Sequence, residues 1–316
     1  MSDTQASLCR KINSAGDLQS VVRTMKAMAA SSISQYEQSV CALGDYYHSV
    51  ELGLGVCFRG AGPEALMTRE TRQRDASATA AVVFGSDQGL VGQFNDVVAD
   101  YAIKTLADLT DKPQVWAVGE RVHARLADAG LPLMGLFTVP NSVKDITPLV
   151  GQILIESETR RCLSATPRAG HGQVTELHLF YNRPTSGAVY APVSQRLLPL
   201  DHNWQRKLVE RTWPTGNLPE VMGGGTATLR ALIHEYLFVS IFRASAESLA
   251  SENASRLAAM QRAEKNIDEL LDGLNGAFHR LRQSGIDEEL FDVISGFEAL
   301  PTGKAHRNSG RTGCTD

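Results

Sequence analysis

Both ends of the chain carry long stretches without proline, and this feature restricts the possible folds more than any other. Residues 1–62 contain no proline, and Ser2 and Gln5 have the spacing of a capping box at a helix start. Downstream, apolar residues recur in steps of three and four at Ile33, Tyr36, Val40, Leu43, Tyr47, Val50 and Leu54. This spacing predicts a helix packed lengthwise against another helix, and we expect it to end at Gly60, Gly62 and Pro63.

The C-terminal stretch repeats this pattern over an even longer distance. It follows Gly223-Gly224-Gly225, with Thr226 as the expected N-cap, and has no proline before Pro301. Its apolar positions are Met260, Ala263, Ile267, Leu270, Leu274, Phe278 and Leu281. A helix of this length would span roughly 100 Å, far more than an ordinary globular helix. It needs another long helix as its partner.

The middle of the chain has a different periodicity. Short apolar runs alternate with helix-like segments near 95–109, 120–129 and 145–163; the runs are Thr79–Phe84, Val115–Val118, Leu131–Phe137 and Leu177–Tyr181. This alternation predicts a mainly parallel sheet covered by helices. We therefore expect an α/β fold: an antiparallel coiled coil of helices 1–60 and 223–300, a Rossmann-like domain over 61–222 inserted between them, and a disordered tail at 301–316.

Composition excludes several classes of protein. The net charge of -4 does not favour a general nucleic-acid binder. No run of about eighteen apolar residues predicts a membrane span, and residues 1–5 do not read as a secretory signal. The cysteines, at positions 9, 41, 57, 162 and 314, are scattered as expected for reduced cytosolic thiols.

A search for catalytic motifs yields no convincing set, and we expect no cofactor or metal. The glycine-rich segment from Gly85 to Gly92 lies where a phosphate loop would sit, but its spacing fits neither common phosphate-binding motif. A tight strand-to-helix turn is the favoured interpretation. His234-Glu235 suggests a zinc motif, but Phe238 stands where the second histidine would be required.

Three segments carry a resemblance to a known family. The run from Glu247 to Asn266, which includes Ser251-Glu252, Arg256 and Met260, resembles the C-terminal signature of the gamma subunit of F-type ATP synthases. Ser86-Asp-Gln-Gly89-Leu90 and the run from Met25 to Ser31 resemble two other segments of that family, and the similarity covers residues 5 to 300.

The chain also departs from the family pattern. The run Ser32–Tyr36 replaces a basic run, Asn253 replaces a histidine, Val91 a cysteine and Asp287 a threonine. Such departures fit a divergent or alternative ATP synthase, for example the N-type lineage.

The resemblance implies a non-catalytic central rotor that couples ion flow to ATP synthesis or hydrolysis. Its expected partners are the alpha, beta and epsilon subunits and the membrane ring of c subunits. This places it peripherally on the cytoplasmic face of a bacterial cell membrane, which it reaches only through the complex. The implied coupling residues, which contact partners, are Met25, Lys26, Arg256, Arg282, Gln283, Asp287 and Glu289.

Two other functions compete with the rotor. A nucleotide-dependent α/β enzyme with helical extensions would need a phosphate loop or catalytic set in the middle of the chain. A scaffold coiled coil would not need the specific polar residues near the end of the last helix, which from spacing alone read as a solvated face. The choice between H⁺ and Na⁺, and between synthesis and hydrolysis, depends on residues outside this chain.

Overall fold

The structure is a computed structural model that describes residues 4–67, 78–109, 113–163, 174–185, 189–217, 219–221 and 225–298. Two compact units are present: residues 23–262 form one, and residues 1–22 with 263–316 form the other. The expected tail at 301–316 lies outside the described residues.

A five-stranded sheet forms the centre of the larger unit. Its strands are β1 (Ala78–Phe84), β2 (Gln114–Val118), β3 (Leu133–Phe137), β4 (Val174–Arg183) and β5 (Ala191–Leu198). The strand order is β3-β2-β1-β4-β5, with four parallel strands and β5 antiparallel to β4. The predicted α/β class with a mainly parallel sheet is confirmed. The apolar runs did not predict β5, whose pattern is half-buried rather than continuously apolar.

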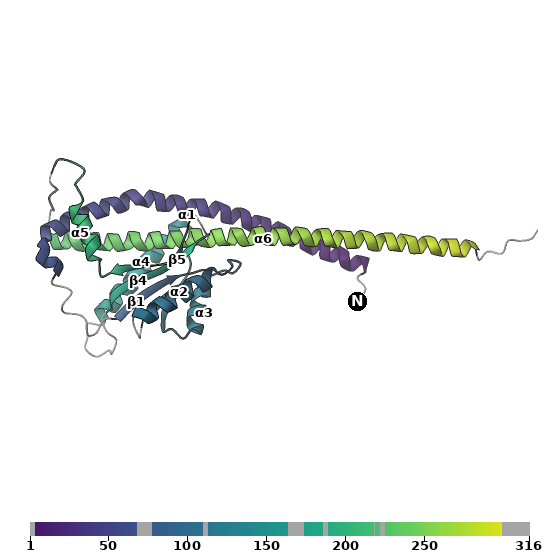
Figure 1. Ribbon diagram of the computed structural model, residues 1–316, viewed down its shortest axis with the longest axis horizontal. Helices are drawn as coiled ribbons and strands as arrows, with labels where there is room; N and C mark the ends of the chain where they lie inside the picture. The colour runs from purple at the N-terminus through teal and green to yellow at the C-terminus, as the bar shows by residue number, and fades with distance from the viewer. Residues whose placement is uncertain are drawn as a thin grey trace, which may run out of the picture. The chain divides into compact units, whose positions relative to one another are not determined.

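The two faces of the sheet are covered by different helices because successive side chains of a strand point in opposite directions. Ala81 and Val83 of β1 pack beneath α2 (Phe94–Leu109) and α3 (Glu120–Asp128). Val82 and Phe84 face the other core, which α4 (Val143–Leu163), α5 (His202–Glu210) and the two terminal helices complete. Figure 1 shows these layers on the two sides of the sheet.

The terminal helices α1 (Gln5–Met67) and α6 (Gly225–Glu298) lie antiparallel within the larger unit. The Tyr46 hydroxyl donates to Glu235 Oε2 at 2.8 Å, whereas Tyr36, further towards the N-terminus, lies beside Glu252. Both helices contribute fully buried residues to the core, Leu54 from α1 and Ile241 from α6. The sheet domain therefore packs directly on the helix pair.

Among the described residues, the smaller unit consists of the first part of α1 and the last part of α6. Gln19 donates a hydrogen bond to Asp268, so the two helices contact each other here, and Figure 1 shows them running in opposite directions. Continuing this pairing places the start of α1, at Gln5, opposite Arg282. Residues of α6 beyond that point have no α1 residue opposite them.

Several predicted helix details are wrong. Helix α1 continues through Gly60, Gly62 and Pro63 to Met67, since a helix already packed by buried Leu54 and Phe58 tolerates the loss of one backbone hydrogen bond. Helix α6 begins at Gly225, so Thr226 lies inside its first turn. Leu270, predicted on the packing seam, has 52% of its surface exposed.

The expected capping residue Ser2 lies outside the described residues. The side chain of Thr4 accepts from Ser7 N at 3.4 Å at the observed start of α1.

Candidate functional site

The loop after β1 lies where a doubly wound sheet would bind a nucleotide. The chain leaves β1 through α2 towards β2, whereas it leaves β4 in the other direction, directly to the antiparallel strand β5, so the strand order reverses at the carboxyl ends of β1 and β4. The loop is held by its own polar groups. Asn95 accepts from Ser86 N at 2.9 Å and donates to Ser86 Oγ at 2.8 Å, and the Ser86 hydroxyl donates to Gln88 O.

Asp87 in the same loop joins two neighbouring segments. Its Oδ1 accepts from Glu120 N, at the start of α3, at 2.9 Å, and its Oδ2 accepts from Val139 N at 3.0 Å. A carboxylate at a helix N-terminus satisfies a free backbone donor and interacts favourably with the helix dipole. The Ser86-Asp87 segment therefore has a structural role, in a loop of residues 85–93 that connects β1 to α2.

We expect Asp87→Asn to lower the free energy of unfolding by about 1–2 kcal/mol, because the amide retains only one of the two acceptor oxygens. Urea unfolding of the purified chain measures this loss. Asp100→Asn is the control, since Asp100 forms an exposed pair with Arg125 between α2 and α3. Equal losses in the two variants would contradict the proposed role of Asp87.

Helix α6 closes the crevice at the switch point. The Ser255 hydroxyl donates to Val91 O at 2.6 Å, and the Ser251 hydroxyl lies 2.9 Å from Asn182 O at the end of β4. These bonds hold α6 over the edge of the sheet at which a nucleotide would bind. The described residues therefore give no support to the nucleotide-dependent enzyme.

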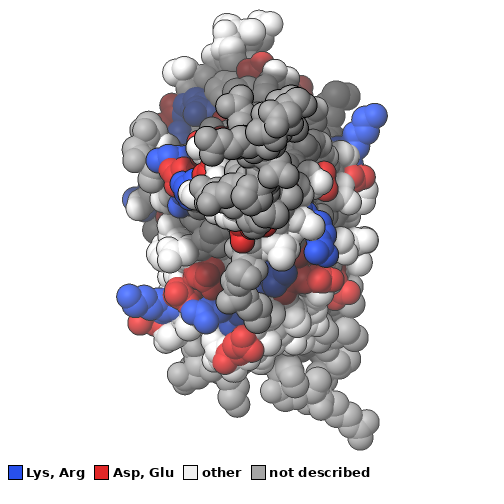
Figure 2. Space-filling model, turned by 90° about the vertical axis from the view of Figure 1, so that its right-hand side faces the viewer, with Lys and Arg blue, Asp and Glu red and all other residues white. Residues whose placement is uncertain are grey.

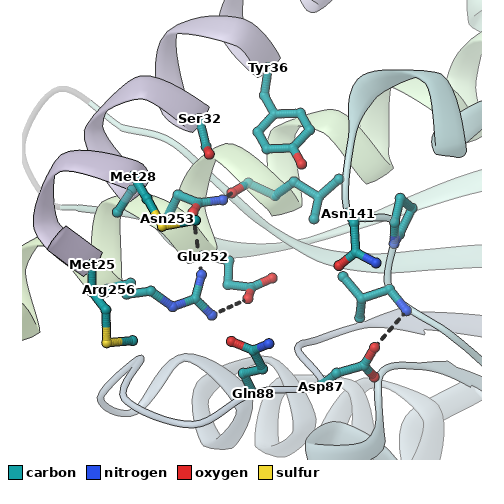
Figure 3. Close-up of a pocket in the computed structure, with 14 residues that line it drawn as sticks. Met25, Met28, Ser32, Tyr36, Asp87, Gln88, Asn141, Glu252, Asn253 and Arg256 are labelled. Atoms are coloured by element: carbon teal, nitrogen blue, oxygen red, sulfur yellow. Dashed lines mark hydrogen bonds and ion pairs between the residues drawn. The ribbon is translucent and has the colours of Figure 1, made fainter. Parts of the chain in front are cut away.

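A cavity of about 260 Å³ remains beside this crevice, between α1, α6 and the loops that follow β1 and β3. Met25, Met28 and Tyr36 line it from α1, and Glu252 and Arg256 line it from α6 (Figure 3). Two of the predicted coupling residues, Met25 and Arg256, thus share one cavity. Lys26, another predicted coupling residue, is half-buried on α1 and lies outside the cavity lining.

The polar centre of the cavity is an ion pair within one turn of α6. Arg256 Nη2 lies 2.5 Å from Glu252 Oε1, and Arg256 Nη1 donates to Asn253 Oδ1 at 3.3 Å. Both charged side chains are largely buried: 13% of the Arg256 side chain and 6% of the Glu252 side chain are exposed. Burial raises the pKa of Glu252 above its ordinary value of 4.5, and Arg256 opposes the rise without cancelling it.

This raised pKa predicts an unusual dependence of stability on pH. The folded state binds the Glu252 proton more tightly than the unfolded chain does. The free energy of unfolding therefore falls as pH rises from 4.5 through the folded pKa, by at most about 1.4 kcal/mol per pH unit. The free energy of unfolding can be measured by urea unfolding at several pH values between 4 and 8. Glu252→Gln should remove the part of its decrease with pH that Glu252 causes. Glu269→Gln, at an exposed position of α6, should leave it unchanged; parallel curves for wild type and Glu252→Gln would contradict the assignment.

The other four predicted residues lie at the end of α6. Arg282, Gln283, Asp287 and Glu289 are all exposed. Apolar side chains of the same segment, one before Asp287 and the rest after Glu289, are exposed as well: Ile286 54%, Leu290 56%, Phe291 69%, Val293 69% and Ile294 46%. Such a surface, polar and apolar together, is typical of a site covered by another protein.

Sequence reasoning did not select Tyr36 or Glu252 as site residues, although both line the cavity. Glu252 belongs to the C-terminal signature, but only the fold shows that its carboxylate is buried. One substitution in the family pattern also has a structural explanation. Asn253 donates to Leu249 O at 2.8 Å and accepts from Arg256. The contact at Val91 uses its backbone carbonyl, which any residue would supply, and does not explain the valine.

Surface charge and metal-ligand geometry add no further site. On the face drawn in Figure 2, basic and acidic side chains of the described residues are interspersed. Among described residues, no group of three or more His, Cys, Asp or Glu side chains has the arrangement to hold a metal ion. No helix among them is long and apolar enough to cross a membrane.

The fold and this surface define a class of protein: a subunit built on paired terminal helices that acts through partners rather than through a catalytic pocket. The sequence profile of the ATP synthase family matches residues 4–300. The chain belongs to this family, among its gamma chains, the non-catalytic central-stalk subunits of F-type ATP synthases.

Individual relatives agree with this assignment. The ATP synthase gamma chain of Anaeromyxobacter sp. (strain Fw109-5) is 26% identical over 305 residues, which cover 92% of this chain and 97% of the relative. The gamma chain of Moorella thermoacetica is 26% identical over 298 residues, which cover 93% of this chain and 98% of the relative.

Solved structures share the fold. A chain of the Euglena gracilis mitochondrial ATP synthase, from a structure of OSCP, F1 and the c-ring, matches with a TM-score of 0.60 and 16% identity over 98% of both chains. A chain from the central stalk and c-ring of the Tetrahymena thermophila mitochondrial enzyme matches with a TM-score of 0.54 and 20% identity, covering 77% of this chain and 99% of that one.

Proposed function

We propose that this chain turns inside a ring of alpha and beta subunits and that the end of α6 carries its principal coupling contacts. The observation that carries the proposal is the exposed surface after Leu281. Arg282, Gln283, Asp287 and Glu289 share this segment with exposed apolar side chains, and the start of α1 does not cover it. We assign these four polar residues to contacts with the catch loop of the beta subunit.

The chemistry of these residues suits a contact that must form and break. Arginine and carboxylate groups make charge-assisted hydrogen bonds, which are directional and roughly twice as strong as neutral ones. Water competes for the same groups at an exposed position, so the contact can be released. A rotor with different contacts on different sides would bias each beta subunit between open and closed states in turn.

Met25, Lys26 and Arg256 form the second proposed coupling zone. Met25 and Arg256 lie on facing walls of the cavity, and exposed Met28 extends the same surface. Methionine side chains adapt to changing surroundings because they are unbranched and polarizable. Such a surface suits repeated contact with more than one conformation of a partner.

The sheet domain is the proposed contact with the epsilon subunit and the c-ring. The Euglena and Tetrahymena structures that share this fold contain a c-ring, which supports a c-ring as a partner. The chain would then reach a bacterial cell membrane from the cytoplasmic face through the complex alone. The Ser32–Tyr36 run and Asp287 support a divergent or alternative complex rather than a housekeeping one.

Co-purification tests the proposed function. The tagged chain, expressed with the alpha and beta subunits encoded in the same genome, should bring both down in a complex that hydrolyses ATP. A variant that ends after residue 281 should recover less of the pair while keeping the sheet domain folded. Failure of the full chain to bring down alpha and beta would overturn the proposal, and nucleotide bound by the isolated chain would favour the enzyme instead.

A further inference from the structure

A row of polar side chains on α6 joins that helix to the sheet domain, apart from the coupling surfaces described above. Glu247, Ser251 and Ser255 follow one another at intervals of four residues, which places them on one face of the helix. All three are buried. Buried polar groups of this kind need partners, and theirs come largely from the sheet domain.

Glu247 forms the first contact of the row. Its Oε2 accepts from Arg183 Nε at 2.8 Å, at the end of β4, and its Oε1 accepts from Arg243 Nε at 2.7 Å, one turn earlier in α6. Only 9% of the Glu247 side chain is exposed, compared with 41% for Arg183. Arg183 also bonds to the hydroxyl of Tyr181, whose burial raises its pKa to about 12 and keeps it a neutral phenol.

The two serines extend the row along the domain. The Ser251 hydroxyl shares its hydrogen between Asn182 O in β4 and Glu247 O in α6, each 2.9 Å away, and the Ser255 hydroxyl donates to Val91 O in the loop after β1. The side chain of Asn182 in turn donates to Phe94 O at the start of α2, at 2.9 Å. One face of α6 is thereby bonded to a strand and a loop, and through Asn182 to a helix start.

The same part of α6 also contributes apolar side chains to the core, among them Ala244, Leu249 and Ala250. The free energy of apolar burial depends on the area removed from water and has no preferred direction, although close packing also resists sliding. Hydrogen bonds lose strength steeply when their distance or angle changes. The polar row is therefore the directional part of the interface, and it adds to the resistance against rotation of α6 relative to the sheet.

We infer that Glu247, Ser251 and Ser255 form the joint through which torque passes between the sheet domain and the helix pair. This inference rests on the proposed function, because only a rotor is loaded in this way. Glu247, Ser251, Ser255 and Arg183 are positioning residues: they keep α6 in register with the domain that faces the membrane ring.

The test uses membrane vesicles that carry the whole complex, in which ATP hydrolysis and ATP-driven ion pumping are measured together. The variants are Glu247→Gln, which keeps the side-chain volume, and the triple variant Glu247→Gln, Ser251→Ala, Ser255→Ala. We expect hydrolysis by the triple variant to stay within about twofold of wild type while ions pumped per ATP fall at least about threefold, since the joint slips under load. Glu247→Gln alone should lower the number of ions pumped per ATP by less than the triple variant does.

Asp100→Asn is the matched control, because it weakens an ion pair inside the sheet domain that does not reach α6. Its pumping ratio should equal that of wild type. An unchanged ratio in the triple variant, or a parallel fall of hydrolysis and pumping, would overturn the joint. Absence of ATP-driven pumping by the wild-type complex would overturn both the joint and the proposed function.

Discussion

Replacement of Arg282 and Gln283 by alanine is expected to lower ATP turnover by the assembled complex by about tenfold. Each side chain can supply a hydrogen bond to the beta subunit, and a bond to a charged group contributes about 1.5–3 kcal/mol when its partner would otherwise be left unpaired. A loss of about 1.4 kcal/mol in the step that contact with the rotor drives is sufficient for the tenfold change. Steady-state hydrolysis and ATP-driven ion pumping by the same preparation measure the effect.

The isolated double variant should unfold at the temperature of the wild-type chain, because both side chains are exposed. Lys265→Ala with Glu269→Ala is the matched control, since this pair lies on the same helix and its side chains are 78% and 68% exposed. Only the Arg282 and Gln283 variant should lose turnover. Normal turnover and normal coupling in that variant would remove the end of α6 from the proposed mechanism.

The second large effect concerns the stability of the sheet domain. Gly119, between β2 and α3, has a φ of +110°. A Cβ atom there would lie 2.8 Å from backbone atoms of Ser86. We expect Gly119→Ala to lower the free energy of unfolding by about 3 kcal/mol or more, because strained backbone and overlap with a fixed loop add together.

Gly130→Ala separates these two contributions. Gly130 also has a positive φ, +77°, but a Cβ atom there would meet nothing within 4 Å. Gly130→Ala should lower the free energy of unfolding by about 1–2 kcal/mol, which is the cost of the left-handed conformation alone. Urea unfolding followed by tryptophan fluorescence suits both variants, because Trp116 is buried in β2. Equal losses in the two variants would show that the close approach of Ser86 to Gly119 is unimportant.

The two long helices and the sheet were predictable because their signals are periodic and local. Steps of three and four marked Tyr36, Val50 and Leu54, all of which are buried. The apolar runs that became β1 and β2 are buried on both faces, as expected of central parallel strands. Strand β5 escaped prediction because an edge strand with intermediate burial lacks such a run.

Helix ends were predicted less well because they depend on energies that local sequence does not contain. Pro63 does not end α1, since tertiary packing of the preceding turns outweighs one missing hydrogen bond. Leu270 fits the apolar repeat of α6 yet is half exposed. Residues three and four positions apart both lie on the same side of a helix, so the spacing alone does not determine which of them the partner helix covers.

The amino-acid sequence by itself determined the two paired terminal helices, the inserted α/β domain and, through the C-terminal signature, the family. Each of these depends on residues that are near one another in the chain or on a matching pattern. The tertiary structure alone decided that the crevice of the sheet is filled by Ser251 and Ser255, that Met25 shares a cavity with Arg256, and that Glu247 joins α6 to β4. These contacts join residues tens to hundreds of positions apart, and burial and hydrogen-bond partners exist only after the chain has folded.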